Sequence, residues 1–282
     1  MPELPEVETV RTGLERALAG ATIRRVTLRR ANLRFPFPEG FCEALAGKKI
    51  GAIGRRAKYL LFYMGKEQVL IAHLGMTGRF SVCHPAPVAG SGGGPVINAG
   101  IHDHVLFHLK DGRILTYNDA RRFGFMALST RSELETNVLL ADLGPEPLER
   151  AFSPHYLERE LLRRSGPVKS VIMDQKLVVG VGNIYASEAL FLAGIDPRTP
   201  AKKAASASKK LVASIRKVLR DAIASGGSSL RDFVQVSGET GYFQHHFNVY
   251  GREGKPCLTC GTVIRNIRMS GRSSFFCAQC QK

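Results

Sequence analysis

The sequence lacks any long apolar run, and it lacks a charged-then-apolar leader at its start. A membrane-spanning helix requires about 18 or more consecutive apolar residues, and no stretch of this chain approaches that length. A secreted protein would need the leader. We therefore expect a cytoplasmic protein that does not span the membrane, and 282 residues are enough for two domains with cores of their own.

Acidic residues are scarce relative to basic ones. The chain has 24 Asp and Glu against 40 Lys and Arg, a formal net charge of +16. Such a balance favours a polyanionic partner, although a basic enzyme or an anionic membrane surface also fits the charge alone. The charge gathers between residues 201 and 220, which hold seven basic residues and no acid. Leu211, Ile215 and Val218 recur there at helical spacing, so we predict a helix with one packed and one positive face.

Cysteine is also sparse, but four of the six cysteines lie between position 257 and the C-terminus. They form two pairs, Cys257-Leu-Thr-Cys260 and Cys277-Ala-Gln-Cys280, with positions 261–276 between them. Each Cys-x-x-Cys turn can bring two thiolates to one metal, and a hairpin between the turns can join the pairs. A redox dithiol needs only one pair. We predict one structural Zn²⁺ on four thiolates, and we interpret Cys42 and Cys83 as ordinary reduced side chains.

The first half of the chain has the pattern of a helix followed by strands. An apolar stripe of Val7, Val10, Leu14 and Leu18 predicts a helix that begins near Pro5 and stops at Gly20. Strands are predicted over residues 59–63, 69–73, 105–109 and 114–117. Asp111-Gly112 predicts a two-residue hairpin loop between the last two. We interpret this half as a β-sandwich or flattened barrel with the helix attached.

The second half has a helical pattern. Helices are predicted over residues 157–164, 168–175 and 184–193 and up to residue 225, with Gly194 ending the third. A run rich in proline and glycine between residues 84 and 100 is interpreted as an insertion of unassigned role. The expected domains are residues 1–135 (helix and β-sandwich), 136–240 (helices) and 241–282 (zinc finger).

The first residues could do chemistry. Removal of Met1 would expose the secondary amine of Pro2, and an α-amine titrates far below a lysine, so it is a better nucleophile at neutral pH. Glu3 could then serve as an acid or a base. On these residues alone, an ordinary amino terminus is the better explanation.

The residues that follow strengthen that hypothesis. The opening segment at positions 1–11, Met-Pro-Glu-Leu-Pro-Glu-Val-Glu-Thr-Val-Arg, resembles the amino terminus of the bacterial formamidopyrimidine-DNA glycosylases. Matching blocks continue along nearly the whole chain in the same order: Arg55-Arg-Ala-Lys58-Tyr-Leu, His73-Leu-Gly-Met76-Thr-Gly, His102-Asp-His104-Val, Asn118-Asp-Ala-Arg121-Arg-Phe123-Gly, 174–188, Gly241-Tyr-Phe-Gln-His-His246 and the four-cysteine finger with Gly271-Arg272-Ser.

The resemblance implies a fold, a reaction and a partner. The fold is α+β: an N-terminal helix with a β-sandwich, a helix-two-turn-helix domain and a zinc-finger β-hairpin. The implied enzyme is a base-excision-repair DNA glycosylase and AP lyase that removes 8-oxoguanine and formamidopyrimidines from duplex DNA. In it Pro2 attacks C1′ of the damaged nucleotide and forms a Schiff base, and β,δ-elimination follows. The resemblance further implies a monomer, bound to damaged or abasic DNA in a bacterial nucleoid.

The resemblance also assigns roles to residues of this chain. Pro2, Glu3, Lys58 and Arg272 are the implied catalytic residues; the matching position of Glu6 is equally explained by the helix dipole. An extruded base leaves a gap in the duplex, and the implied gap-filling residues are Met76, Arg121 and Phe123. The other implied DNA contacts are His102, Arg164, Lys169, Asn183 and Tyr185, and Ser228 and Tyr242 are the candidates in a loop over the lesion.

Asn183 carries a local expectation as well. It precedes the predicted helix at residue 184, so we expect its side chain to cap that helix and the neighbouring amides to form a phosphate-binding nest.

Three departures from the family pattern and two rival functions are open. Ala120 stands where many relatives have proline, the finger reads Ser273-Ser-Phe-Phe276, slightly different from the common pattern, and the insertion at residues 84–100 is longer than expected. Endonuclease VIII activity, directed at oxidised pyrimidines, is the nearest rival, although Leu4 and the Arg121–Phe123 block favour the purine-directed branch. A DNA-binding protein without enzymatic activity is the other, and the pairing of Pro2 with Glu3 argues against it.

Overall fold

The computed structural model describes residues 1–83, 100–228 and 243–282. The insertion predicted at residues 84–100 therefore lies, apart from its last residue, outside the described residues. The chain forms two compact units. The first contains Met1–Pro2 and Glu6–Ala141, and the second contains Glu3–Pro5, Asp142–Ser228 and the C-terminal residues that follow the second gap.

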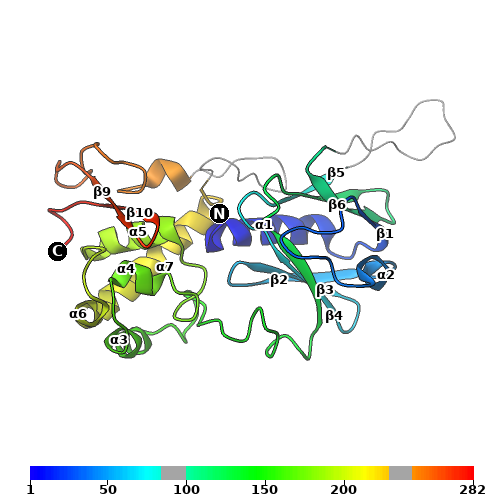
Figure 1. Cartoon of the computed structure of the whole chain (residues 1–282), viewed down its shortest axis with the longest axis horizontal. Coiled ribbons are helices and arrows are strands. Elements are labelled where there is room, and N and C mark those ends of the chain that lie inside the picture. Colours follow the sequence, from blue (N-terminus) through cyan, green and yellow to red (C-terminus); the bar gives the residue numbers. More distant parts are fainter. Residues whose placement is uncertain (84–99, 229–242) are drawn as a thin grey trace. The chain divides into compact units, whose positions relative to one another are not determined.

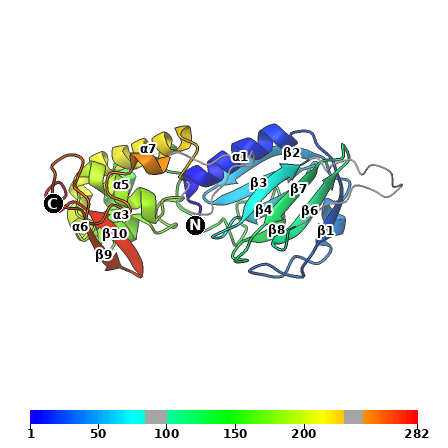
Figure 2. The same cartoon turned by 90° about the horizontal axis from the view of Figure 1, so that it is seen from above.

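The first unit contains two four-stranded antiparallel sheets (Figures 1 and 2). One sheet has the order β1-β6-β7-β5 and the other β2-β3-β4-β8. The strands are β1 (Ile23–Leu28), β2 (Ile50–Arg56), β3 (Tyr59–Met64), β4 (Gln68–His73), β5 (Arg79–Cys83), β6 (Asp103–Leu109), β7 (Ile114–Asn118) and β8 (Phe125–Thr130). The four strands predicted from the sequence are thus present as β3, β4, β6 and β7.

Helix α1 (Leu4–Leu18) forms as its apolar stripe predicts. Val7, Val10, Leu14 and Leu18 are all buried and join the core cluster of the sandwich, and α1 runs alongside the strands in both views (Figures 1 and 2). Burying such side chains stabilises each by about 1.5–3 kcal/mol. A short helix, α2 (Phe41–Leu45), adds Phe41 and Leu45 to the same core.

The hairpin between β6 and β7 differs from its prediction in one detail. Leu109 N–H donates to Arg113 O, and Gly112 N–H donates to Leu109 O. Gly112 has φ +88°, whereas Asp111 has no positive φ. A two-residue type I′ loop requires positive φ at both positions. The prediction of two loop residues was therefore wrong: three residues, 110–112, form the loop, with glycine in the left-handed position.

The second unit consists of short helices and a C-terminal hairpin. Its elements are α3 (Pro154–Leu162), α4 (Val168–Ile172), α5 (Asn183–Ala193), α6 (Ala201–Ala204), η1 (Ala205–Ala207), α7 (Ser208–Ala224), η2 (Phe243–His246), β9 (Arg265–Met269) and β10 (Arg272–Phe276). Gly194 ends α5 in the left-handed conformation, as predicted. Three predicted ends were wrong: α3 begins at Pro154, where Ser153 accepts a hydrogen bond from Tyr156 N–H, it ends at Leu162, and α4 ends at Ile172.

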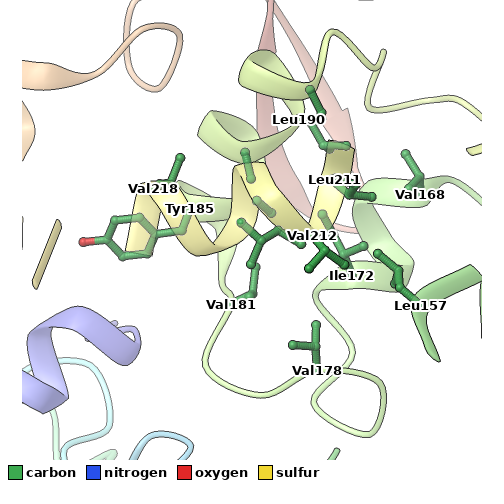
Figure 3. Close-up of a cluster of buried hydrophobic side chains, with 14 of the residues drawn as sticks. Leu157, Val168, Ile172, Val178, Val181, Tyr185, Leu190, Leu211, Val212 and Val218 are labelled. Atoms are coloured by element: carbon green, nitrogen blue, oxygen red, sulfur yellow. The ribbon is translucent and has the colours of Figure 1, made fainter. Parts of the chain in front are cut away.

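One apolar core joins these helices (Figure 3). Leu211 and Val212 of α7 lie in it with Leu157 of α3 and Val168 of α4. The opposite face of α7 carries exposed Lys209 and Lys210, among others, as the charge pattern predicted. Arg216 has a structural role, because its guanidinium donates to the carbonyls of Pro147, Glu149 and Phe152.

The observed elements agree with the predicted α+β class: a helix and sandwich, then helices, then a hairpin with four cysteines. Among the helices of the described residues, none has the length and apolar character needed to cross a bilayer.

Candidate functional site

The four C-terminal cysteines form a cluster suited to a metal ion. The Sγ atoms of Cys257, Cys260, Cys277 and Cys280 all lie within 4.8 Å of one another. Two of the pairs, Cys260–Cys277 and Cys257–Cys280, are 3.4 Å and 3.9 Å apart. Tetrahedral zinc with bonds of about 2.3 Å sets its thiolates roughly 3.8 Å apart, so the thiolates fit one structural Zn²⁺. Four protein thiolates fill the tetrahedral coordination and leave no open position, so this metal stabilises the fold and does not catalyse.

The hairpin between the cysteine pairs presents Arg272. Strands β9 and β10 pair antiparallel, with Arg272 opposite Met269. Ser270 (φ +47°) and Gly271 (φ +75°) form the loop, and positive φ at both positions is typical of a type I′ turn. Arg272 is exposed at the start of β10, whereas Ser274, further along the same strand, is fully buried.

The carboxylate of Glu3 binds the beginning of α5. Its Oε2 accepts hydrogen bonds from Gly182 N–H at 2.9 Å and Tyr185 N–H at 3.4 Å, and its Oε1 accepts from Ile184 N–H at 3.0 Å. A Cβ at Gly182 would lie 2.3 Å from the Glu3 carboxyl carbon, so only glycine allows this approach. A negative charge at a helix N-terminus is favourable. Glu3 is therefore held as a buried carboxylate.

The predicted cap on α5 was wrong. The capping residue is Gly182, without a side-chain hydrogen bond, and Asn183 is the first residue of the helix. The Asn183 side chain instead accepts from Lys169 Nζ at 2.8 Å and donates to Ser273 O at 3.0 Å. Glu3 takes the helix amides that we expected to form a phosphate nest. No local sequence rule finds this acceptor, because Glu3 lies 179 residues before Gly182 in the chain.

Lys169 joins α4, α5 and the finger hairpin. Besides Asn183, its Nζ donates to Ser274 Oγ at 2.7 Å and Ser273 O at 3.1 Å. Burial lowers the pKa of Lys169 to about 8; the charge of Glu3 opposes this shift and that of Arg272 adds to it. The prediction placed Lys169 at DNA, and the structure places its ammonium in a buried polar network.

The depressed pKa of Lys169 predicts a pH-dependent stability. Since the folded pKa of about 8 lies below the ordinary 10.5, the unfolded chain binds more protons between these values. The free energy of unfolding should therefore rise with pH in that window, relative to a Lys169→Met variant, by at most about 1.4 kcal/mol per pH unit. Urea unfolding of both proteins from pH 7 to 10.5 measures this. The control is Lys217→Met, which removes an exposed lysine paired with Asp221 and keeps Lys169. The difference in unfolding free energy between wild type and Lys217→Met should not rise with pH in that window. Parallel pH curves for wild type and Lys169→Met would contradict the assignment.

Met76, Arg121 and Phe123 lie on two loops that are packed against each other. A Cβ at Gly75 would lie 2.3 Å from the backbone of both Phe123 and Gly124. The guanidinium carbon of Arg121 lies 4.7 Å from the centre of the Phe123 ring. Phe123 is 45% exposed, Arg121 is exposed and Met76 is half-buried. The structure thus brings the three predicted gap-filling residues together and leaves the two on the second loop on the surface.

The carboxylate of Asp119 connects these two loops, and sequence reasoning missed it. Its Oδ1 accepts from Thr77 Oγ1 at 2.5 Å, and its Oδ2 accepts from Gly124 N–H at 2.8 Å. Asp119 is fully buried. Thr77 Oγ1 in turn accepts from Arg121 N–H at 3.1 Å. The signal was present in the Asn118-Asp-Ala-Arg121 block, where only the arginine and Phe123 received roles.

Two histidines support the same loops. His73 Nδ1 accepts from Gly75 N–H at 3.0 Å, and its ring stacks on Phe125. Burial, with added repulsion from Lys58 and Arg34, lowers the pKa of His73 to about 4, so the ring is a neutral acceptor at pH 7. The predicted DNA contact His102 is exposed, and its carbonyl accepts from Asp119 N–H at 3.0 Å.

The remaining candidates are distributed over both units. Pro2, Glu6 and Lys58 are buried, and Lys58 follows Ala57, a non-glycine residue at φ +54° whose carbonyl accepts from Arg55. A left-handed alanine stores backbone strain, a feature that clusters at functional sites.

Two of the weaker candidates are engaged within the second unit. Arg164 pairs with Asp174 at 2.5 Å. Tyr185 lies in the helical core, with its hydroxyl 3.4 Å from Ser228 Oγ. Tyr242 lies outside the described residues.

Comparisons with known proteins place this site in a family. The model of the formamidopyrimidine-DNA glycosylase N-terminal domain matches residues 1–126, and that of the H2TH domain of the same family matches residues 143–234. A zinc finger found in FPG and IleRS matches residues 254–282.

Full-length relatives and solved structures agree with these matches. Formamidopyrimidine-DNA glycosylases of Azorhizobium caulinodans and Ruegeria pomeroyi are 51% and 48% identical to this chain, with 100% of both chains covered in each case. The MutM (FPG) protein of Thermus thermophilus matches with a TM-score of 0.85 and 38% identity over 99% of this chain and 98% of its own. A Lactococcus lactis FPG mutant in complex with Fapy-dG containing DNA matches with a TM-score of 0.88 and 35% identity over 100% of both chains. The chain belongs to the formamidopyrimidine-DNA glycosylase family.

Proposed function

We propose that this DNA glycosylase of base excision repair removes oxidised purines, 8-oxoguanine and formamidopyrimidines, from duplex DNA and then cuts the strand as an AP lyase. One observation carries the proposal. The buried carboxylate of Glu3, held by three backbone amides at the beginning of α5, those of Gly182, Ile184 and Tyr185, directly follows Pro2 in the chain. A nucleophilic amine next to a fixed carboxylate is the pair that this reaction needs.

The proposed chemistry uses the amine of Pro2 after removal of Met1. Its nitrogen attacks C1′ of the damaged nucleotide, and the glycosidic bond breaks with its electron pair passing to the base. The C1′–O4′ bond then opens, O4′ takes up a proton, and the nitrogen lone pair forms the C=N bond of a Schiff base. The Schiff base makes the C2′ proton acidic, so that β-elimination breaks the C3′–O bond and δ-elimination then breaks the C5′–O bond. Because three N–H donors favour its ionised form, Glu3 acts first as a base.

Charged side chains are proposed to bind the phosphates of the DNA and to supply protons during the two eliminations. Lys58 binds a phosphate and supplies the proton for β-elimination, and Arg272 on the finger hairpin binds a phosphate and assists δ-elimination. Asn183 and Lys169 help to position Arg272, because both donate hydrogen bonds to the carbonyl of the neighbouring Ser273. Arg164 and Tyr185 are retained as weaker DNA contacts.

Extrusion of the damaged base costs a few kcal/mol, and its gap must be filled. We assign Met76 and Phe123 to replace stacking, as thioether and aromatic side chains can, and Arg121 to hydrogen-bond the orphaned base. His102 contacts the backbone, and Ser228 and Tyr242 contact the extruded base. The partner is double-stranded DNA with oxidised purines or abasic sites, bound by a monomer in a bacterial cytoplasm. The proposed domains are residues 1–135, 136–240 and 241–282.

Borohydride trapping tests the proposal. On a duplex with 8-oxoguanine opposite cytosine, borohydride should reduce the Schiff base to a stable adduct, and mass mapping should find the DNA on Pro2. Pro2→Gly should reduce trapping sharply, because glycine lacks the secondary amine. An adduct that maps to Lys58, or full activity in a protein that keeps a blocked Met1, would contradict the scheme.

The same assay with thymine glycol separates the purine-directed function from endonuclease VIII activity. Faster cleavage of thymine glycol than of 8-oxoguanine would favour the pyrimidine-directed branch. Binding of abasic DNA without any trapped adduct would indicate a DNA-binding protein without enzymatic activity.

A further inference from the structure

The connection between β1 and α2 is a basic and aromatic surface that the proposed function leaves unused. Residues 29–40 contain three arginines and one acid, the exposed Glu39. Arg30 and Arg34 are exposed, and Phe35 is 51% exposed.

Backbone contacts fix the shape of this connection. Leu33 is buried and its N–H donates to Phe35 O at 3.1 Å. Asn32 and Pro36 form an isolated antiparallel bridge. The guanidinium of Arg29 is already engaged, because it donates to the carbonyls of Gly100 and Asp103. Arg30, Arg34 and Phe35 are therefore presented outward by an ordered turn.

This turn is joined to the loop that carries Arg121 and Phe123. Arg34 N–H donates to Gly124 O at 3.1 Å, one residue after Phe123. The Phe35 ring lies edge-on against Phe125, 5.4 Å between centres. Arg34 lies 5.4 Å from the centre of the Phe35 ring, as Arg121 lies 4.7 Å from that of Phe123. Two exposed arginine–phenylalanine pairs thus lie next to each other on one unit.

The chemistry of this surface fits a nucleic-acid backbone. Guanidinium groups bind phosphates, and an exposed aromatic ring can lie against a deoxyribose or stack on a base. The connection carries three arginines against one acid, Glu39, so its net charge attracts a polyanion.

We propose that Arg30, Arg34 and Phe35 form a second duplex-binding surface, which holds the DNA that flanks the extruded nucleotide beside the Arg121–Phe123 loop. The two arginines bind phosphates, and Phe35 lies against a deoxyribose. The inference rests on the proposed function, since it assumes that Arg121 and Phe123 face DNA. It extends the bound DNA beyond the lesion and adds residues that no chemical step requires.

The salt dependence of binding tests the arginines. The dissociation constant of the full-length protein is measured on a duplex with a tetrahydrofuran abasic analogue over a range of salt concentrations. Each phosphate contact contributes about 0.9 to the slope of log K against log salt. Arg30→Gln and Arg34→Gln should each lower the slope by about that amount.

Arg131→Gln is the matched control. Arg131 is also exposed and also stacks on an aromatic ring, 4.7 Å from the centre of Tyr63. It follows the Thr130 end of β8, whereas Phe125, which contacts Phe35, lies at the other end. A strand of this length separates its ends by about 17–20 Å. Arg131→Gln should therefore leave the slope unchanged.

Two substitutions of Phe35 separate stacking from folding. Phe35→Leu keeps an apolar side chain against Phe125 but removes the flat ring, and it should weaken binding about 5-fold or more without a change in salt slope. Phe35→Tyr should bind as the wild type does. Thermal unfolding of each variant checks that the fold is retained.

Three results decide the matter. Wild-type slopes in Arg30→Gln and Arg34→Gln, or equal loss of slope in Arg131→Gln, would overturn the inference while trapping on 8-oxoguanine DNA leaves the proposed function standing. If Phe35→Leu binds as tightly as the wild type, the role of the ring is wrong. If the wild-type protein neither binds the abasic duplex nor forms a trapped adduct, the proposed function fails together with this surface.

Discussion

Replacing Glu3 with glutamine is expected to reduce excision of 8-oxoguanine by about 10²–10⁴-fold, the range that a positioned acid or base contributes. Glutamine matches the size of glutamate but cannot accept a proton at neutral pH. It also places an NH₂ group where a carboxylate oxygen now accepts a backbone N–H of α5. The unfolding free energy should fall by about 1–3 kcal/mol, the cost of an unsatisfied buried donor.

The loss of stability has to be separated from the loss of chemistry. Glu188, a residue of α5, offers a matched control. Its buried carboxylate also accepts hydrogen bonds from three backbone N–H groups, those of Asn248, Val249 and Tyr250. Glu188→Gln should lower the melting temperature comparably while excision per folded molecule stays near wild type.

Single-turnover excision and binding to the tetrahydrofuran duplex are measured on both variants below their melting temperatures. Glu3→Gln should bind the duplex almost as the wild type does. If its excision rate matches that of Glu188→Gln, the carboxylate of Glu3 has a structural role only.

The contrast between Glu3 and Asn183 shows what the sequence could predict. Helix α1 was predictable because its determinants are local: an apolar stripe at helical spacing, a proline in the first turn and a glycine after the end. Asn183 failed as a cap because the helix received a better acceptor from residue 3, and a charged acceptor outcompetes an amide. N-cap preference compares only residues next to the helix start, so it cannot include an acceptor from a distant part of the chain.

Strand pairing shows the same limit. The strands β3 and β4 were predictable from their apolar residues, and they pair as neighbours in sequence. Nothing in the local pattern indicates that β1 pairs with β6, because β2, β3, β4 and β5 all lie between them in the chain. The pattern of residues therefore predicted a β-sandwich or flattened barrel, a helical second half and a zinc site, the family resemblance added the helix-two-turn-helix assignment, and the strand order required the structure.

Asp119 illustrates a residue whose role lies in contacts with another loop. Its carboxylate accepts hydrogen bonds from Gly124 N–H and from the hydroxyl of Thr77. Strands β5, β6 and β7 separate Thr77 from Asp119 in the chain. An aspartate before Ala-Arg-Arg resembles an ordinary turn residue. The cysteine cluster was predictable for the opposite reason, because the spacing of metal ligands is itself local.

Removal of the zinc ion is expected to unfold the finger and to abolish tight DNA binding. The finger has few apolar residues in its own core: Val249, Cys257, Ile264 and Cys277, packed on Phe191 of α5. A segment of this size does not fold without a metal or other cross-link, and structural zinc sites supply about 10–16 kcal/mol in isolated fingers. Cys277→Ser, or chelation of the wild-type protein, should therefore release β9 and β10.

The effect reaches the DNA-binding residues through Lys169. When β10 unfolds, Lys169 loses two of its three acceptors, Ser273 and Ser274. Arg272, at the start of the same strand, then loses its fixed position. Affinity for the tetrahydrofuran duplex should fall at least about 100-fold, a larger effect than one lost phosphate contact produces.

Zinc content by atomic emission, the melting temperature and duplex binding are measured together. Cys42→Ser and Cys83→Ser are the controls, since neither cysteine belongs to the cluster, and both should retain one equivalent of zinc. Full zinc content in Cys277→Ser would refute the four-thiolate site. Wild-type affinity in the zinc-free protein would refute the role of the finger in DNA binding, because that role requires the metal to order the hairpin that presents Arg272.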